Sequence, residues 1–228
     1  MVRGTLHYDV VSPWSVFAYA VLKRYRKHWN MDLVLKPVFL GGVMAASGNQ
    51  PPLKIPNKGK WMNRVDMPLA GEFFELPYTF PKKFPINTIH CMRLLRAIEQ
   101  HTPGKLEKAT DLFFAAIWQP ASGKTADDAI APTNFPSMLA QDNLFSQAEI
   151  DKLIAAANSD EVKGLLKTDS QKLVDEGAFG FPWIVLERDD GEKRSFFGSD
   201  RFEAMAFWLG KDYKGPVPDG RKKASAKL

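Results

Sequence analysis

The sequence has a single cysteine, Cys91, among its 228 residues. A lone cysteine cannot form an intramolecular disulfide, and it excludes the cysteine-rich sites that hold structural zinc. We therefore expect a protein of a reducing compartment. The four histidines are scattered without partners at metal-ligand spacing, so we expect no metal site.

Long apolar runs are also missing. No stretch approaches the roughly 18 residues that a membrane-spanning helix needs. The N-terminal stretch MVRGTLHYDVV reaches Asp9 before an apolar signal core can form. The sequence therefore predicts a chain with no membrane span and no standard secretory signal.

Neither sign of charge is in large excess, because 31 Lys and Arg against 26 Asp and Glu leave +5. The last ten residues, DGRKKASAKL, hold four basic residues and one acidic residue, so four minus one, or +3, lies in this tail. Only +2 remains for residues 1–218, and a body so close to neutral argues against a nucleic-acid partner. The 45% of hydrophobic residues predict a globular chain with its own core.

The N-terminal part has the pattern of strand, helix and strand. Residues Thr5–Val11 are β-branched and aromatic, as in a short buried strand. Asp32–Leu40 is the next expected strand, and its Pro37 favours an edge position. Between the two strands, apolar side chains recur at helical spacing at Phe17, Val21, Tyr25 and Trp29. Such a unit normally closes as a parallel crossover.

The middle of the chain is predicted to be mostly helical. Residues 41–85 are rich in Gly, Pro and Asn, and SGKTADDAIAPTNFP is expected to be a loop. Helical patterns cover Asn87–Gln100, Lys105–Trp118, Ser146–Asn158 and Glu161–Glu176. We assign about 120 residues to a helical insertion.

The C-terminal part returns to strands. Trp183–Glu187 and Lys193–Phe197 flank the turn Arg188–Gly191, which indicates an antiparallel hairpin. Ser199-Asp200 is expected to cap a following helix that runs through Trp208, with Glu203 completing a capping box.

This order of elements indicates an α/β fold, a thioredoxin-like domain with an all-helical insertion in the DsbA-like topology. The expected parts are a thioredoxin-like domain from residues 1–44 and 177–218, a helical insertion of residues 45–176, and a basic tail of residues 219–228.

The first strand-to-helix turn decides which chemistry such a domain can perform. Redox enzymes of this fold carry Cys-x-x-Cys there, whereas this chain has Ser12-Pro13-Trp14-Ser15. Hydroxyl groups cannot exchange disulfides, so that chemistry is excluded at the turn. Ser12 is expected to cap the helix, and Pro13 suits its first turn. The helix N-terminus would still stabilise a thiolate that a substrate brings.

The second feature is Phe179-Gly180-Phe181-Pro182, just before a predicted strand. Thioredoxin-like folds place a cis-proline at this point, facing the active turn. A cis bond at Phe181-Pro182 would leave the backbone of Phe181 available to an extended peptide ligand.

Five strings now resemble a known family, the kappa-class glutathione S-transferases, together with the related 2-hydroxychromene-2-carboxylate isomerases. The strings are YDVVSPWS at residues 8–15, SGNQPP at 47–52, NKGKWM at 57–62, GAFGFPW at 177–183 and FGSDR at 197–201. They follow one another at family-like spacing, and the resemblance covers nearly the whole chain.

The resemblance implies a glutathione transferase that uses glutathione as cosubstrate, attacks a small electrophile, contains no metal and forms a homodimer. It implies that Ser12 donates a hydrogen bond to the glutathione sulfur. The other implied binding residues are Asn49 and Lys58 at the cysteinyl-glycine end, Phe181 and Pro182 at the cysteinyl backbone, and Ser199, Asp200 and Arg201 at the γ-glutamyl end.

Two other functions stay open. One is a glutathione-dependent isomerase of the hydroxychromene-carboxylate type, and the other is a non-catalytic thioredoxin-like binding module. The final residues Ala226-Lys227-Leu228 are one residue from the Ser-Lys-Leu peroxisomal address. We therefore expect recognition by the peroxisomal import receptor and a peroxisomal location, with a cytoplasmic or mitochondrial location as the alternative.

Overall fold

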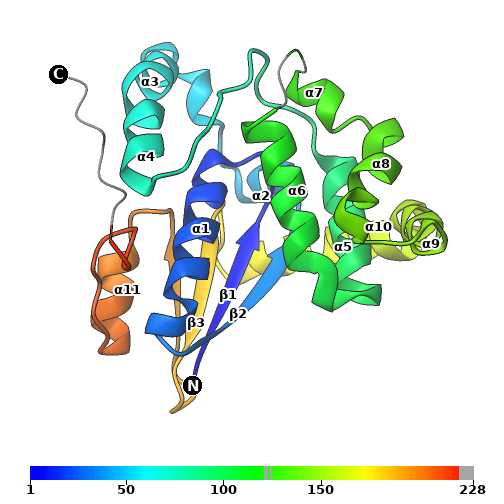
Figure 1. The fold of residues 1–228 in the computed structure, drawn as a ribbon. Helices are drawn as coiled ribbons and strands as arrows, with labels where there is room; N and C mark the ends of the chain where they lie inside the picture. Colours follow the sequence, from blue (N-terminus) through cyan, green and yellow to red (C-terminus); the bar gives the residue numbers. More distant parts are fainter. Residues whose placement is uncertain (121–122, 124, 221–228) are drawn as a thin grey trace.

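The N-terminal and C-terminal segments of the chain share one four-stranded sheet (Figure 1). The computed structural model describes residues 1–120, 123 and 125–220. The strand order is β2-β1-β3-β4, with β1 parallel to β2 and antiparallel to β3, and β3 antiparallel to β4. The strands are β1 (Val2–Tyr8), β2 (Met31–Pro37), β3 (Trp183–Glu187) and β4 (Lys193–Phe197). This sheet, with its many helices, confirms the predicted α/β thioredoxin-like class.

The first strand ends at Tyr8, three residues before its predicted end at Val11. The chain turns at Asp9, whose carbonyl accepts a hydrogen bond from the backbone N–H of Ser12 at 3.0 Å. Strand β2 lies at the edge of the sheet, as Pro37 predicts, because proline cannot donate to a further strand.

Helix α1 (Pro13–His28) connects β1 to β2 and packs against the sheet. The four apolar residues at helical spacing are all buried in the main core, as predicted: Phe17, Val21, Tyr25 and Trp29. Helix α11 (Phe202–Leu209) lies beside α1 and buries Phe202 and Met205 in the same core (Figure 1).

Helices also form where the sequence predicts none. Residues 41–85 contain α2 (Leu40–Ser47), α3 (Pro56–Trp61) and α4 (Met67–Phe74), with a π-helical turn over Met62–Asp66. The expected loop at 122–136 contains α7 (Ala126–Ala129) and the start of α8 (Phe135–Leu139). The predicted helices are present as α5 (Ile89–His101), α6 (Leu106–Trp118), α9 (Gln147–Asn158) and α10 (Asp160–Asp175).

Two apolar clusters hold the sheet between them. The large one joins α1 and α11 to the helices of the middle segment, and it encloses Cys91, which is 1% exposed. The smaller one joins Val43 of α2 and Leu173 of α10 to Phe181 and Trp183. No helix in the described residues combines the length and hydrophobicity needed to cross a membrane.

Candidate active site

Ser12 occupies the N-cap of α1, as predicted. Its φ and ψ of −84° and 116° are extended, and its Oγ accepts a hydrogen bond from the backbone N–H of Ser15 at 3.2 Å. The first turn of α1 contains no acidic residue, so no carboxylate there opposes the positive end of the helix dipole. Ser12 is 4% exposed, and the turn therefore offers a partly desolvated hydroxyl and a helix N-terminus to an anion.

The peptide bond between Phe181 and Pro182 is cis, as the sequence predicts. Ser12 Oγ donates to the carbonyl oxygen of Phe181 at 3.2 Å, across 169 residues of sequence. The cis-proline segment therefore lies directly against the turn at the start of α1, and the Ser12 hydroxyl is already paired.

Asn49 is joined to the same segment. It follows Gly48, whose left-handed conformation ends α2, and its Nδ2 donates to the carbonyl oxygen of Phe179 at 2.7 Å. Its Oδ1 accepts from the backbone N–H of Gln50 at 2.8 Å. The structure thus brings Asn49 to the loop that carries Phe181 and Pro182.

The end of β4 also meets the cis-proline. The backbone N–H of Gly198 donates to the carbonyl oxygen of Pro182 at 3.1 Å. Ser199 follows as a buried residue, and Asp200 and Arg201 form an exposed ion pair at 2.5 Å. Segments 179–182 and 198–201 are therefore neighbours.

The predicted cap of the last helix is wrong. Helix α11 begins at Phe202, its N-cap is Arg201, and no side chain caps it. The carboxylate of Asp200 pairs with Arg201 instead and folds back toward Gly198, where an added Cβ would lie 2.6 Å from Asp200 Oδ1. The predicted capping box of Asp200 with Glu203 is absent because the chain enters the helix one residue later than expected, with Arg201 at the N-cap.

Lys58 is not joined to these segments. It lies on α3 and is exposed, and the described contacts give it no hydrogen bond to Ser12, Asn49 or the cis-proline loop. Its role at the glutathione site stays a prediction.

Asp9 is a site-adjacent residue that the sequence reasoning missed. Its carboxylate is fully buried and accepts hydrogen bonds from Val11 N at 3.0 Å, Leu40 N at 2.8 Å and Thr88 Oγ1 at 2.7 Å. Burial raises the pKa of Asp9 to about 6, although the three donors act in the opposite direction. The sequence did contain a signal for this residue: Asp9 is a carboxylate at the end of an apolar strand, three residues before the helix cap Ser12.

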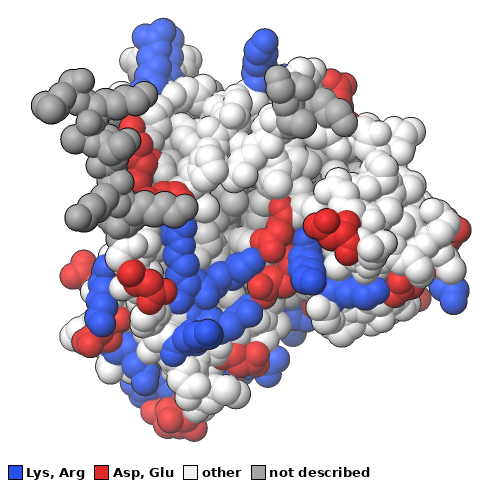
Figure 2. All heavy atoms as spheres, in the orientation of Figure 1, with Lys and Arg blue, Asp and Glu red and all other residues white. Residues whose placement is uncertain are grey.

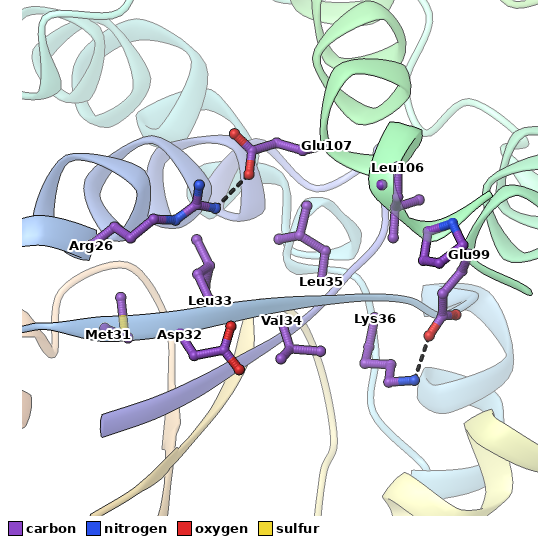
Figure 3. A pocket seen from close by; sticks show the side chains of 12 residues that line it. Arg26, Met31, Asp32, Leu33, Val34, Leu35, Lys36, Glu99, Leu106 and Glu107 are labelled. Atoms are coloured by element: carbon purple, nitrogen blue, oxygen red, sulfur yellow. Dashed lines mark hydrogen bonds and ion pairs between the residues drawn. The ribbon is translucent and has the colours of Figure 1, made fainter. Parts of the chain in front are cut away.

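A cavity of about 630 Å³ lies elsewhere, along the outer edge of β2 (Figure 3). Two ion pairs line it, between Arg26 and Glu107 and between Lys36 and Glu99. None of the predicted site residues borders this cavity, so it is separate from the Ser12 site. Nor do three His, Cys, Asp or Glu residues gather as a metal site anywhere in the described ranges.

Figure 2 shows how charge is distributed over one face of the molecule. Basic and acidic side chains are interspersed over the lower part of this face, whereas much of its upper part, between α3/α4 and α6, is uncharged. The N-terminal end of α1 points toward this uncharged part.

The chain is similar to known proteins along nearly its whole length. Residues 5–209 match the family model of the DSBA-like thioredoxin domain. Glutathione S-transferase kappa 1 of Rattus norvegicus is 34% identical over 218 residues, which cover 93% of each chain. The human protein of the same name is 33% identical with the same coverage.

The chain belongs to the kappa-class glutathione S-transferase family.

This kappa-class chain also shares its fold with a more distant enzyme. The solved structure of 2-hydroxychromene-2-carboxylate isomerase aligns with a TM-score of 0.70 at 16% identity, over 91% of this chain and 94% of that one. At this identity the likeness shows the fold alone. It confirms the DsbA-like topology that the kappa class shares with the isomerase.

Proposed function

We propose that this protein binds glutathione at the N-terminus of α1 and transfers its sulfur to a small electrophile. The observation that carries the proposal is the contact of Ser12, in place of a redox cysteine, with the cis-proline segment. The kappa-class relatives, which are named glutathione S-transferases, support the same activity.

Binding would exchange hydrogen bonds at Ser12 rather than break them. In the structure the Ser12 hydroxyl donates to the carbonyl oxygen of Phe181. An extended cysteinyl residue could give its own N–H to that carbonyl, and the freed Ser12 O–H would then turn toward the sulfur. Every donor and acceptor keeps a partner, so the exchange leaves no buried polar group unpaired.

The helix N-terminus and the Ser12 hydroxyl both favour the thiolate over the thiol. A free thiol has a pKa near 8.5, and lowering it by about 2 units, which corresponds to roughly 2.7 kcal/mol, would make the thiolate dominant at pH 7. The thiol proton leaves to solvent. The sulfur then forms a bond to the electrophilic carbon, and the leaving group departs with its electron pair.

The two ends of glutathione would lie on either side of the cysteinyl group. We assign its γ-glutamyl end to Ser199, Asp200 and Arg201, where a carboxylate can pair with Arg201 and an ammonium with Asp200. We assign the cysteinyl-glycine end to Asn49, which contacts the cis-proline loop, and to the exposed Lys58.

The decisive experiment is a titration of the bound glutathione thiol in wild type and in Ser12→Ala. Loss of a charge-assisted hydrogen bond, worth about 1.5–3 kcal/mol, should raise the bound-thiol pKa by about 1–2 units. Thiolate absorbance against pH measures it. Ser195→Ala removes a hydroxyl from the exposed surface of β4 and should leave the pKa unchanged. An unchanged pKa in Ser12→Ala would reject the assigned role of Ser12.

Two measurements on the wild-type protein distinguish the transferase from the binding module and from the isomerase. Calorimetric titration with glutathione tests binding directly, and no binding at millimolar glutathione would favour the binding module. Turnover of a substrate without net consumption of glutathione would favour an isomerase, because the sulfur then adds and leaves again.

Two further parts of the proposal concern the molecule in the cell. We propose a homodimer, because the resemblance to the kappa class implies it. Peroxisomal import through Ala226-Lys227-Leu228 also stays a proposal, since these residues lie outside the described part of the chain.

A further inference from the structure

One arginine of the helical segment has a buried N–H group without an acceptor. Arg93 lies on α5, and its Nε is buried without a hydrogen-bond partner. In the described part of the chain, no carboxylate forms an ion pair with its guanidinium. Residues 121–122, 124 and 221–228 lie outside that part, and they include no Asp or Glu that could supply one.

The unpaired state of Arg93 contrasts with that of its neighbour on the same helix. Arg96, three residues further along α5, pairs with Glu99 and Asp169. A buried donor without an acceptor is costly, and native structures rarely leave one. A water molecule could accept from Nε, but only an anion also offsets the charge of the guanidinium. Arg93 is therefore available to an anion from outside the chain.

Arg93 lines a cavity of about 50 Å³ between α5 and α9, two helices on the side of the molecule that carries the insertion (Figure 1). The described residues that line this cavity include no Asp or Glu. Five of them are apolar, among them Leu94 of α5, Phe135 of α8, and Ile154 and Ala157 of α9. One guanidinium among apolar walls suits a ligand with one anionic end and an apolar body.

The volume of the cavity limits the size of such a ligand. A water molecule takes up about 30 Å³ of the liquid, so a cavity of about 50 Å³ admits only a few non-hydrogen atoms. The two polar residues that line it beside Arg93 are His90, at the start of α5, and Asn158, at the end of α9. Both are exposed, so a ligand can enter from their side.

We infer that the cavity between α5 and α9 binds a short-chain aliphatic carboxylate. Its two oxygens accept hydrogen bonds from Nε and one Nη of Arg93, in the fork geometry that favours arginine–carboxylate pairs. Its alkyl end contacts Ile154 and Ala157. None of the residues that line this cavity belongs to the proposed glutathione site, so the inference is independent of the glutathione chemistry.

Thermal unfolding and calorimetry of the full chain with sodium propionate test the site. Wild type should unfold at a higher temperature in propionate than in sodium chloride of equal ionic strength or in propionamide, the neutral isostere, because a ligand of the folded state stabilises it. Arg93→Met keeps most of the side-chain length but has no N–H, and it should weaken propionate binding at least tenfold. Arg3→Met, on the exposed face of β1, is the matched control and should bind like wild type.

A second variant tests the cavity while Arg93 stays in place. Ala157→Leu fills the space between α5 and α9 and should also weaken propionate binding at least tenfold. Ala155→Leu places the same side chain on the exposed side of α9, and it should leave propionate binding unchanged. Circular dichroism verifies that each variant is folded.

Three results would overturn the inference. One is a wild-type protein that propionate stabilises no more than propionamide does. Another is an Arg93→Met variant that binds propionate as tightly as wild type. The third is stabilisation of wild type by inorganic phosphate and not by propionate, because it would assign Arg93 to an oxyanion without an apolar body.

Discussion

Asp9 links three parts of the chain through one carboxylate. Its oxygens accept hydrogen bonds from the turn before α1, from the first residue of α2, and from Thr88 at the start of α5. Its charge has no basic partner in this contact set, and burial raises its pKa from 3.8 to about 6. Because the folded-state pKa lies above the unfolded one, ionised Asp9 lowers stability. The stabilising effect of its bound proton is complete below the unfolded pKa and is lost as pH rises through about 6.

Asp9→Asn should remove this pH dependence. Two units of pKa correspond to about 3 kcal/mol, so the free energy of unfolding of wild type relative to Asp9→Asn should fall by about that amount between pH 4 and pH 7. Urea unfolding at several pH values measures the difference. Asp151→Asn, on the exposed side of α9, is the control and should leave the wild-type profile in place. A constant difference between wild type and Asp9→Asn would contradict the raised pKa.

At the scale of elements, the connection from β4 to α11 depends on a glycine. Gly198 has φ of +96°, and a Cβ there would lie 2.6 Å from Asp200 Oδ1. The positive φ and the nearby carboxylate of Asp200, which pairs with Arg201, both disfavour a side chain at this position.

Gly198→Ala should lower the free energy of unfolding by about 1–3 kcal/mol and glutathione affinity at least tenfold, because the added methyl group strains the backbone and displaces Asp200. Gly210→Ala is the control. Gly210 also has positive φ, but nothing lies within 4 Å of its missing Cβ, so stability should fall without a change in affinity. Denaturant unfolding and calorimetry measure the two effects, and equal losses of affinity would refute the placement of Asp200.

Helices and strands were predicted correctly where the residues that specify them lie within the element itself. Helix α1 was predictable because its cap, its proline and its apolar spacing all lie within the helix. Helices α3 and α4 were missed because Pro56 and Pro68 resemble helix breakers. Here Pro56 stands in the first helical turn, and Pro68 lies two residues after the π-helical turn over Met62–Asp66. Gly71 also resembles a helix breaker. In the structure a larger residue would not fit there, because the ring of Tyr78 lies 2.6 Å from where a Cβ would be.

At the scale of the molecule, Arg24 ties the thioredoxin-like core to two distant segments. Its Nη1 donates from α1 to the carbonyl oxygens of Phe74 at 2.7 Å and Pro216 at 3.0 Å. Phe74 ends α4, and Pro216 belongs to the segment after α11. One guanidinium therefore holds together parts of the chain that are up to 192 residues apart.

Arg24→Met should lower the free energy of unfolding by about 2–4 kcal/mol, because it keeps the aliphatic stem but leaves these carbonyl oxygens without their donor. Guanidinium unfolding measures the loss. Lys27→Met removes an exposed charge from the same helix and should change stability by less than about 0.5 kcal/mol. Similar effects in the two variants would show that the Arg24 contacts carry little of the stability.

Assembly of the site was the least predictable part at this scale. Ser12, Asn49, the cis-proline loop and the end of β4 come from four separate segments, and only the folded sheet brings them together. Their residue types were visible in the sequence through the resemblance to a family. The hydrogen bond of Ser12 to Phe181 was not, since nothing local to either residue specifies a contact across the chain.

The enclosed position of Cys91 also determines what can be measured on the intact protein. Its thiol lies among the apolar side chains of the core, and burial raises its pKa, so a thiol reagent meets almost no thiolate from the chain itself. Any sulfhydryl that reacts with a chromogenic disulfide in the folded sample then comes from the ligand. Occupancy, ligand turnover and oxidation of the bound tripeptide can therefore be counted by sulfhydryl stoichiometry, on a protein background close to zero.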